Sequence, residues 1–247
     1  MLRALIFDVD GTIADTESLH LEAFNYAFNE LGLGWHWDSA LYTKLLEVSG
    51  GKERVLHYWK QINPDIKSID AQGLEDTVNR IHELKTAYYE GAINAGAVGL
   101  RPGILELFDE AAAAGMQLAI ATTTSPVNIA ALLRRAMGPG WRHAFAAIGD
   151  ASTAPLKKPH PMVYEQILQT LQLDARACLA FEDSGNGLQA ATLAGLATVI
   201  TPTQYTRHHD FSRAMHVLSD LGGVRLADLR QWHQAHWSGE RLLNVDQ

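Results

Sequence analysis

The feature that most restricts the fold is a regular alternation of short apolar runs with longer amphipathic runs, which begins after residue 101. The apolar runs are too short for helices and lack alternating polar positions, so they indicate strands buried on both faces. We expect strands at 116–121, 145–148, 177–181 and 197–201, and helices at 104–115, 125–138, 161–171 and 187–194. Alternation of this kind predicts a parallel sheet covered by helices.

The first part of the chain has a different pattern. Residues 2–7 form another apolar run and predict one more strand of the same sheet. From residue 15 to about residue 92, apolar positions recur at helical spacing with no strand pattern between them. We therefore predict an α/β fold, with a Rossmann-like parallel sheet core and an inserted α-helical domain. We place the core at 1–15 and 97–247, and the insert at 16–96.

The overall charge excludes two classes of partner. The 247 residues carry 28 acidic side chains against 20 Lys and Arg, a formal net charge of −8, without a run rich in Lys or Arg. Binding to nucleic acid or to an anionic membrane needs clustered positive charge, so we expect neither partner. No apolar stretch approaches the roughly 20 residues of a membrane-spanning helix, and a strand at 2–7 leaves no room for a signal peptide. We expect a monomeric, cytoplasmic protein.

Polar side chains gather where the predicted strands end. Asp8 and Asp10 follow the first strand, Thr122 follows the next, and Glu182 and Asp183 follow a third. Because the carboxyl ends of parallel strands share one edge of the sheet, where ligands bind in open α/β folds, we expect one cluster. Carboxylates gathered in one place repel one another unless a cation lies among them, and an all-oxygen set suits Mg²⁺. An Asp-x-Asp-Gly turn and a pair of helix-capping acids are the structural alternatives.

Two further segments supply groups that bind anions. Lys158 precedes Pro159 and could carry a positive charge into the acidic cluster. Thr122, Thr123 and Ser125 lie where a strand passes into a helix, so their hydroxyls and free backbone N–H groups could hold an anion. A solvated surface lysine and an ordinary helix cap are the structural alternatives. Acids with a metal, a lysine, and hydroxyls at a helix N-terminus together predict phosphoryl transfer.

These segments, in this order and spacing, resemble the four sequence motifs of the haloacid dehalogenase superfamily. The segment 8–12 (Asp-Val-Asp-Gly-Thr) resembles the first motif, Thr122 the second, Lys158-Pro159 the third, and the segment 181–184 (Phe-Glu-Asp-Ser) the fourth. The likeness covers nearly the whole chain. The insert lies where phosphatases and mutases of the superfamily carry a cap domain, and a second aspartate at Asp10 is not expected in a dehalogenase.

The resemblance implies a role for each of these residues. Asp8 would be the nucleophile that forms an aspartyl-phosphate, and Asp10 would be the acid for the leaving oxygen and then the base for water. Mg²⁺ would be held by Asp8, Asp183 and the main-chain carbonyl of Asp10, and Glu182 would reach it directly or through water. The residues around the phosphoryl group would be Lys158, Thr122 and Thr123.

The insert and three core segments resemble the CbbY-like branch of the superfamily. The likeness rests on the segments 50–54, 121–125 and 205–208, and on 35–37 (Trp-His-Trp). Members of that branch convert xylulose 1,5-bisphosphate to xylulose 5-phosphate, so the resemblance implies a small sugar bisphosphate as the substrate. Cations of the insert would pair with the second phosphate, and polar side chains would face the sugar. The candidate substrate residues of the insert are Glu17, His20, Tyr42, Gly51, Lys52 and Arg54.

Other interpretations stay open from the sequence. His20 could be an ordinary core histidine, and the segment 50–54 a capped helix start with solvated charges. β-Phosphoglucomutases share this core and cap, but return the phosphate to a sugar instead of water. A dinucleotide-binding protein is the rival from another class, because the segment 185–190 matches G-x-G-x-x-A after a strand. We interpret the remaining histidine pairs as solvated residues of a loop and of a tail after Leu229, without a metal; these are His208, His209, His233 and His236.

Overall fold

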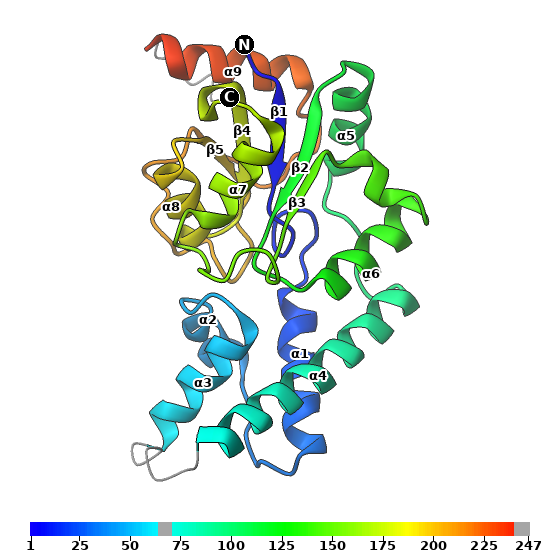
Figure 1. Ribbon diagram of the computed structural model, residues 1–247, viewed down its shortest axis with the longest axis vertical. Coiled ribbons are helices and arrows are strands. Elements are labelled where there is room, and N and C mark those ends of the chain that lie inside the picture. Colours follow the sequence, from blue (N-terminus) through cyan, green and yellow to red (C-terminus); the bar gives the residue numbers. More distant parts are fainter. Residues whose placement is uncertain (64–70, 240–247) are drawn as a thin grey trace.

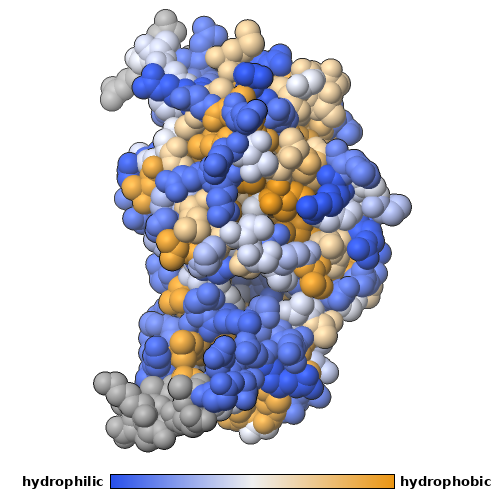
Figure 2. Space-filling view, viewed as in Figure 1, coloured by the Kyte–Doolittle hydropathy of each residue, from blue (hydrophilic) through white to orange (hydrophobic). Residues whose placement is uncertain are grey.

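The protein has two lobes, a sheet lobe and a helical lobe, which lie one above the other in Figure 1. The structure is a computed structural model that describes residues 1–63 and 71–239. Parts of the predicted insert (64–70) and of the predicted core (240–247) lie outside the described residues. Figure 2, from the same side, shows a mostly hydrophilic surface on the helical lobe and more apolar surface on the sheet lobe.

The described part of the sheet lobe contains one parallel sheet of six strands, and the alternation of the sequence predicts the parallel sheet and five of these strands. Their order is β3-β2-β1-β4-β5-β6, so β1 lies in the middle with β2 and β4 on its two sides. The strands are β1 (Ala4–Phe7), β2 (Gln117–Ala121), β3 (Ala147–Gly149), β4 (Cys178–Glu182), β5 (Ala197–Ile200) and β6 (His216–Val217).

Two strands differ from the sequence prediction. β3 begins at Ala147 and not at residue 145, because Phe145 ends a 3-10 turn (Trp141–Ala144) and packs its ring into the core instead of pairing. β6 has only two residues, His216 and Val217, and pairs at the edge of the sheet with β5. A two-residue strand carries no apolar run, so the pattern of the sequence does not predict it.

Helices cover both faces of the sheet. Successive residues of a strand point to opposite faces, so Leu5 and Phe7 pack on one side and Ala4 and Ile6 on the other. The first side is covered by α5 (Ile104–Ala113), α6 (Pro126–Met137) and α9 (Leu226–Ser238), and the second by α7 (Met162–Leu171) and α8 (Gly185–Leu193). The predicted solvated tail after Leu229 is wrong for the described residues, because α9 buries Leu229, His233 and Ala235.

In its described residues, the helical lobe is built from four helices around an aromatic core. The largest buried rings are Phe24, Phe28, Trp37 and Tyr42, and Tyr205 of the sheet lobe joins them. The helices are α1 (Glu17–Glu30), α2 (Ser39–Leu45), α3 (Gly51–Ile62) and α4 (Ala71–Ala95). Among the described residues, none of the helices is long and apolar enough to cross a membrane.

The chain passes between the lobes twice, before α1 and after α4, and Arg101 ties the two crossings together. The backbone N–H of Arg101 donates to the Ile13 carbonyl at 2.8 Å. Its guanidinium group donates to the carbonyls of Gly11 and Thr201, the latter at 2.6 Å. Both connections are therefore fixed beside the loop that follows β1.

Candidate active site

The parallel strands bring three carboxylates together at one edge of the sheet. β1 and β4 pair in register with Phe7 opposite Phe181, so the residues that follow them are neighbours. Asp8, Glu182 and Asp183 are buried, and one oxygen atom of each lies within 4.8 Å of the others. We call these three residues the acidic cluster.

Lys158 reaches into the acidic cluster from the loop before α7. Its Nζ donates hydrogen bonds to Asp8 Oδ1 at 2.6 Å, to Glu182 Oε1 at 2.5 Å and to the Ala121 carbonyl at 2.8 Å. Burial by itself lowers the pKa of a lysine, but the two carboxylates outweigh it and raise the pKa of Lys158 above its ordinary value. The ammonium group is therefore charged and offsets part of the negative charge around it.

One lysine does not balance three carboxylates. Burial raises the pKa of Asp8 to about 7, and Glu182 adds to this rise while Lys158 opposes it. Burial, together with Asp8 and Glu182, raises the pKa of Asp183 well above its ordinary range. The Oε2 atom of Glu182 is buried without a hydrogen-bond partner. Buried oxygen donors with uncompensated negative charge fit a divalent cation.

Two glycines leave the space that these carboxylates fill. Gly187 lies in the first turn of α8, and a Cβ atom there would overlap the carboxylate of Glu182. Gly11 has a φ angle of +82°, and a Cβ atom there would overlap the carboxylate of Asp183. A side chain at either position would displace a member of the acidic cluster.

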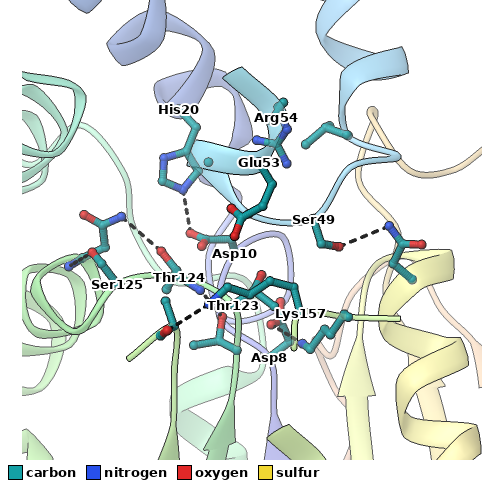
Figure 3. A pocket seen from close by; sticks show the side chains of 18 of the residues that line it. Asp8, Asp10, His20, Ser49, Glu53, Arg54, Thr123, Thr124, Ser125 and Lys157 are labelled. Atoms are coloured by element: carbon teal, nitrogen blue, oxygen red, sulfur yellow. Dashed lines mark hydrogen bonds and ion pairs between the residues drawn. The ribbon is translucent and has the colours of Figure 1, made fainter. Parts of the chain in front are cut away.

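Asp10 points away from the acidic cluster, although it is two residues from Asp8. Its Oδ1 accepts a hydrogen bond from Thr16 Oγ1 at 2.6 Å and lies 2.9 Å from His20 Nε2, at the base of the helical lobe (Figure 3). Burial pushes the pKa of Asp10 upward, but His20 and Thr16 together hold it below its ordinary value. The two aspartates therefore differ in protonation, since Asp10 is ionised under conditions in which Asp8 still binds a proton.

The segment from Thr122 to Ser125 closes another side of the site, ahead of α6. Ser125 caps this helix, because its hydroxyl accepts from the N–H of Asn128 at 3.3 Å. Thr122 is buried and accepts from the N–H of Thr124 at 3.3 Å, and Thr123 lines the cavity. Thr122, Thr123 and Thr124 all line the cavity, so their hydroxyl groups could donate to an anion there.

A cavity of about 540 Å³ separates the acidic cluster from the helical lobe. In Figure 3, Arg54 and Glu53 face it from the helical lobe, and Asp8 and Lys157 lie on the side of the sheet. The predicted residues Glu17, His20, Gly51, Lys52 and Arg54 all line this cavity.

Tyr42 lies behind the wall of the cavity and is fully buried. Its hydroxyl donates to Glu17 Oε2 at 2.7 Å and accepts from Arg54 Nη1 at 3.3 Å. Arg54 is also fixed through its Nε, which donates to the Leu45 carbonyl at 3.1 Å. Tyr42 therefore holds two side chains that line the cavity, Glu17 and Arg54.

Two cavity residues on α4 are absent from the sequence prediction. Lys85 is buried, with its Nζ 5.4 Å from the ring centre of Phe24 and 5.2 Å from that of Tyr89, and burial lowers its pKa to about 8. Burial and then the charges of Lys85 and Lys52 lower the pKa of His82 to about 4. The sequence could have indicated the burial of Lys85, because this residue has helical spacing from the buried residues Val78, Ile81 and Tyr89 on one face of the helix.

The interpretation of four histidines as solvated is wrong for two of them. The side chain of His209 is only 10% exposed, because it lies between α8 and the helical lobe. His233 is a buried residue of α9, and its Nε2 accepts from the indole N–H of Trp237 at 3.1 Å. His208 and His236 are exposed, as predicted.

The fold and the site define a phosphatase of the haloacid dehalogenase-like hydrolases. The model of that family matches residues 2–195, and the chain belongs to the family. This membership removes the dinucleotide-binding alternative, whose glycine pattern at 185–190 here makes room for Glu182.

Among its relatives are CbbY proteins. Protein CbbY of Cupriavidus necator is 50% identical over 250 residues, which cover 94% of this chain and 97% of that protein. The crystal structure of CbbY from Rhodobacter sphaeroides in complex with phosphate has a TM-score of 0.83 and 39% identity, and covers 93% of this chain and 100% of that one. A mutant of the same protein, in complex with xylulose 1,5-bisphosphate, matches with a TM-score of 0.83 and 38% identity, over 93% of this chain and 99% of that one.

Proposed function

We propose that this phosphatase depends on Mg²⁺ and converts xylulose 1,5-bisphosphate to xylulose 5-phosphate through an aspartyl-phosphate. The observation that carries the proposal is the division of charge across the cavity. One wall holds the acidic cluster with Lys158. The opposite wall holds three cations, Lys52, Arg54 and Lys85, beside two acids, Glu17 and Glu53. A substrate with a phosphate at each end matches both walls, and the CbbY structure with this bisphosphate supports the choice.

In the proposed reaction, Asp8 attacks the phosphorus atom. Asp8 would attack as the carboxylate, with its charge balanced by Lys158 and the metal. A bond forms between its carboxylate oxygen and phosphorus and the bond from phosphorus to the sugar oxygen breaks, while Asp10, which must first take up a proton when the substrate is bound, gives that proton to the sugar oxygen. Water then attacks the aspartyl-phosphate and releases phosphate, while Asp10 takes the proton of the water. The ionised state of Asp10 beside Thr16 and His20 supports its part as the base.

The residues around Asp8 would hold the phosphoryl group. Lys158 Nζ, 2.6 Å from Asp8 Oδ1, would balance its charge, and Thr122 and Thr123 would donate to its oxygens. Mg²⁺ would be held by Asp8, Asp183, the Asp10 carbonyl and Glu182, and when bound it supplies positive charge that favours attack by one anion on another. The unpartnered Oε2 of Glu182 supports a direct contact.

The helical lobe would act as the cap that selects the substrate, with the boundaries 16–96, and the sheet lobe (1–15 and 97–247) as the catalytic core. Lys52, Arg54 and Lys85 would bind the second phosphate, and Glu17 would face the sugar. Gly51 would offer its backbone at the start of α3. In this proposal Tyr42 acts through Glu17 and Arg54 without touching the sugar.

The experiment that tests this proposal is a substrate screen with and without Mg²⁺. We expect release of inorganic phosphate from xylulose 1,5-bisphosphate, with formation of xylulose 5-phosphate, only when Mg²⁺ is present. Conversion of β-glucose 1-phosphate to glucose 6-phosphate, with a sugar bisphosphate as primer and without phosphate release, would instead identify a mutase. If many sugar monophosphates are turned over as fast as the bisphosphate, the proposed role of the second phosphate in substrate selection is wrong.

A further inference from the structure

The loop 203–209 of the sheet lobe contacts the helical lobe at two points. Tyr205 Oη is 3.1 Å from Ser18 Oγ, and its ring lies edge-on to the ring of Tyr42 at 5.8 Å. His209 Nε2 is 3.3 Å from Glu47 Oε1, which belongs to the connection between α2 and α3. The same connection is held from α8, because Asn186 Nδ2 donates to the Glu47 carbonyl and to Ser49 Oγ, a bond drawn in Figure 3.

The loop 203–209 also contacts the turn that carries Asp183. Thr206 Oγ1 donates to Asp183 Oδ2 at 3.2 Å. The backbone N–H of Gly185, at the start of α8, donates to His209 Nδ1 at 3.0 Å. His209 therefore stands between the helical lobe on one side and the turn after Asp183 on the other.

The bond from Gly185 fixes the tautomer of His209. Because Nδ1 accepts a hydrogen bond, it carries no proton in the neutral ring, and the proton is on Nε2. The protonated Nε2 faces Glu47, so it cannot bind a metal there, although Glu47, His208 and His209 lie close enough together to suggest a metal site. The Nε2 atom is buried without a hydrogen bond, and Glu47 can provide the acceptor by a small movement.

We propose that His209 is a positioning residue that couples the seating of the helical lobe, through Glu47, to the turn that holds Asp183, through Gly185. When the helical lobe closes onto the sheet lobe, which we call seating, Glu47 becomes the acceptor for the Nε2–H group of His209. The same imidazole ring then holds Gly185 in place through Nδ1. This inference rests on the proposed phosphatase reaction, in which Asp183 holds Mg²⁺ and the helical lobe binds the second phosphate.

Two substitutions separate the two bonds of His209. In His209→Asn, the amide oxygen takes the place of Nδ1 and still accepts from Gly185, but the side chain does not reach Glu47. In His209→Gln, the amide nitrogen takes the place of Nε2 and can donate to Glu47, but the acceptor for Gly185 is lost. The matched control is His208→Gln, because His208 is 50% exposed and its Nε2 is 3.8 Å from the same Glu47 oxygen.

The first measurement compares xylulose 1,5-bisphosphate with p-nitrophenyl phosphate, which has no second phosphate to hold the helical lobe down. We expect His209→Asn to raise the KM for the bisphosphate about three- to tenfold, with kcat and the aryl phosphate unchanged. His209→Gln should instead lower kcat for both substrates, and His208→Gln should change neither. If His209→Asn and His209→Gln have the same effect on both substrates, the proposed coupling is wrong.

The second measurement is independent of activity. Fluorescence energy transfer between dyes at Glu75→Cys and Asp109→Cys, two exposed positions in different lobes, reports the distance between the lobes; the single native cysteine, Cys178, is buried. With Mg²⁺ and the bisphosphate present, we expect His209→Asn and Glu47→Ala each to lower the fraction of seated molecules, and the double variant to lower it no further. Additive effects would overturn the coupling. If the unmodified protein shows no turnover but Mg²⁺ and the bisphosphate still change the distance between the lobes, the proposed function fails and the coupling can still be tested.

Discussion

The two walls of the cavity differ in the sign of the charge that their surroundings disfavour. At the sheet edge, the pKa values of Asp8 and Asp183 are raised, because burial and neighbouring carboxylates disfavour negative charge there. In the helical lobe, the pKa values of Lys85 and His82 are lowered, because burial and neighbouring cations disfavour positive charge. A bound cation would therefore stabilise the wall at the sheet edge, and a bound anion would stabilise the wall in the helical lobe.

The substitution with the largest expected effect on activity lies in the wall at the sheet edge. We expect Asp8→Asn to lower phosphate release from xylulose 1,5-bisphosphate and from p-nitrophenyl phosphate by about a thousandfold or more, because an amide cannot form the acyl phosphate. Both rates would be measured with Mg²⁺ present. The thermal unfolding of the variant provides the control for folding, and substantial remaining Mg²⁺-dependent activity would show that Asp8 is not the nucleophile.

Substitution in the opposite wall should affect only substrates with two phosphates. We expect Lys85→Met and Lys52→Ala to lower kcat/KM for the bisphosphate about 10- to 100-fold, since each removes a charge-assisted contact with the second phosphate. The loss should be larger for Lys85, which is buried, than for Lys52, which is already bonded to Asn79. Turnover of p-nitrophenyl phosphate is the control, and equal losses on both substrates would contradict the assignment of the second-phosphate site.

The space around the acidic cluster can be tested with two glycines of one helix. We expect Gly187→Ala to destabilise the protein by about 1–3 kcal/mol, because its Cβ overlaps the Glu182 carboxylate. The matched control is Gly185→Ala, whose Cβ would make only ordinary contacts with His209, at 3.5 Å or more. Denaturant unfolding of the metal-free proteins measures both. Similar unfolding free energies for the two variants would mean that Glu182 moves aside without cost.

The smallest expected effect is the dependence of stability on pH. The folded-state pKa of Asp8, about 7, is above its ordinary value, so the folded state binds more protons than the unfolded state at intermediate pH. The stabilisation is therefore complete below the ordinary pKa of 3.8 and is lost as pH rises through about 7. We expect the Tm of the metal-free protein to fall by about 5 °C between about pH 5 and about pH 7.5. The fall should be smaller in Asp8→Asn and in the presence of Mg²⁺, and an equal fall in all three samples would assign it to other groups.

The two walls also differ in how far the sequence predicts them. The carboxyl ends of parallel strands share one edge of the sheet, so Asp8, Thr122, Glu182 and Asp183 could be brought together from the strand pattern alone. Lys158 is in a loop, and its place followed from the resemblance to the family.

Residues of the helical lobe depend on how its helices pack. Whether Tyr42 faces the cavity or lies behind Glu17 depends on the angle between α1 and α2, which no sequence pattern specifies. Lys85 was missed because a lysine is usually expected on the surface, although its spacing from the buried residues of α4 indicates that it lies on their face of the helix. His209 was missed because its burial is produced by residues far away in the sequence, Glu47 and Gly185.

Arg101 ties the two connections between the lobes together, beside the loop that carries Asp8 and Asp10. If the helical lobe rotates about these connections, the displacement of its residues grows with their distance from Arg101. The far ends of α3 and α4 would sweep the widest arc, while Asp10 would move little. Changes near the tip of the helical lobe should therefore alter how readily a substrate is captured, whereas changes at the pivot should alter the alignment of the reacting atoms.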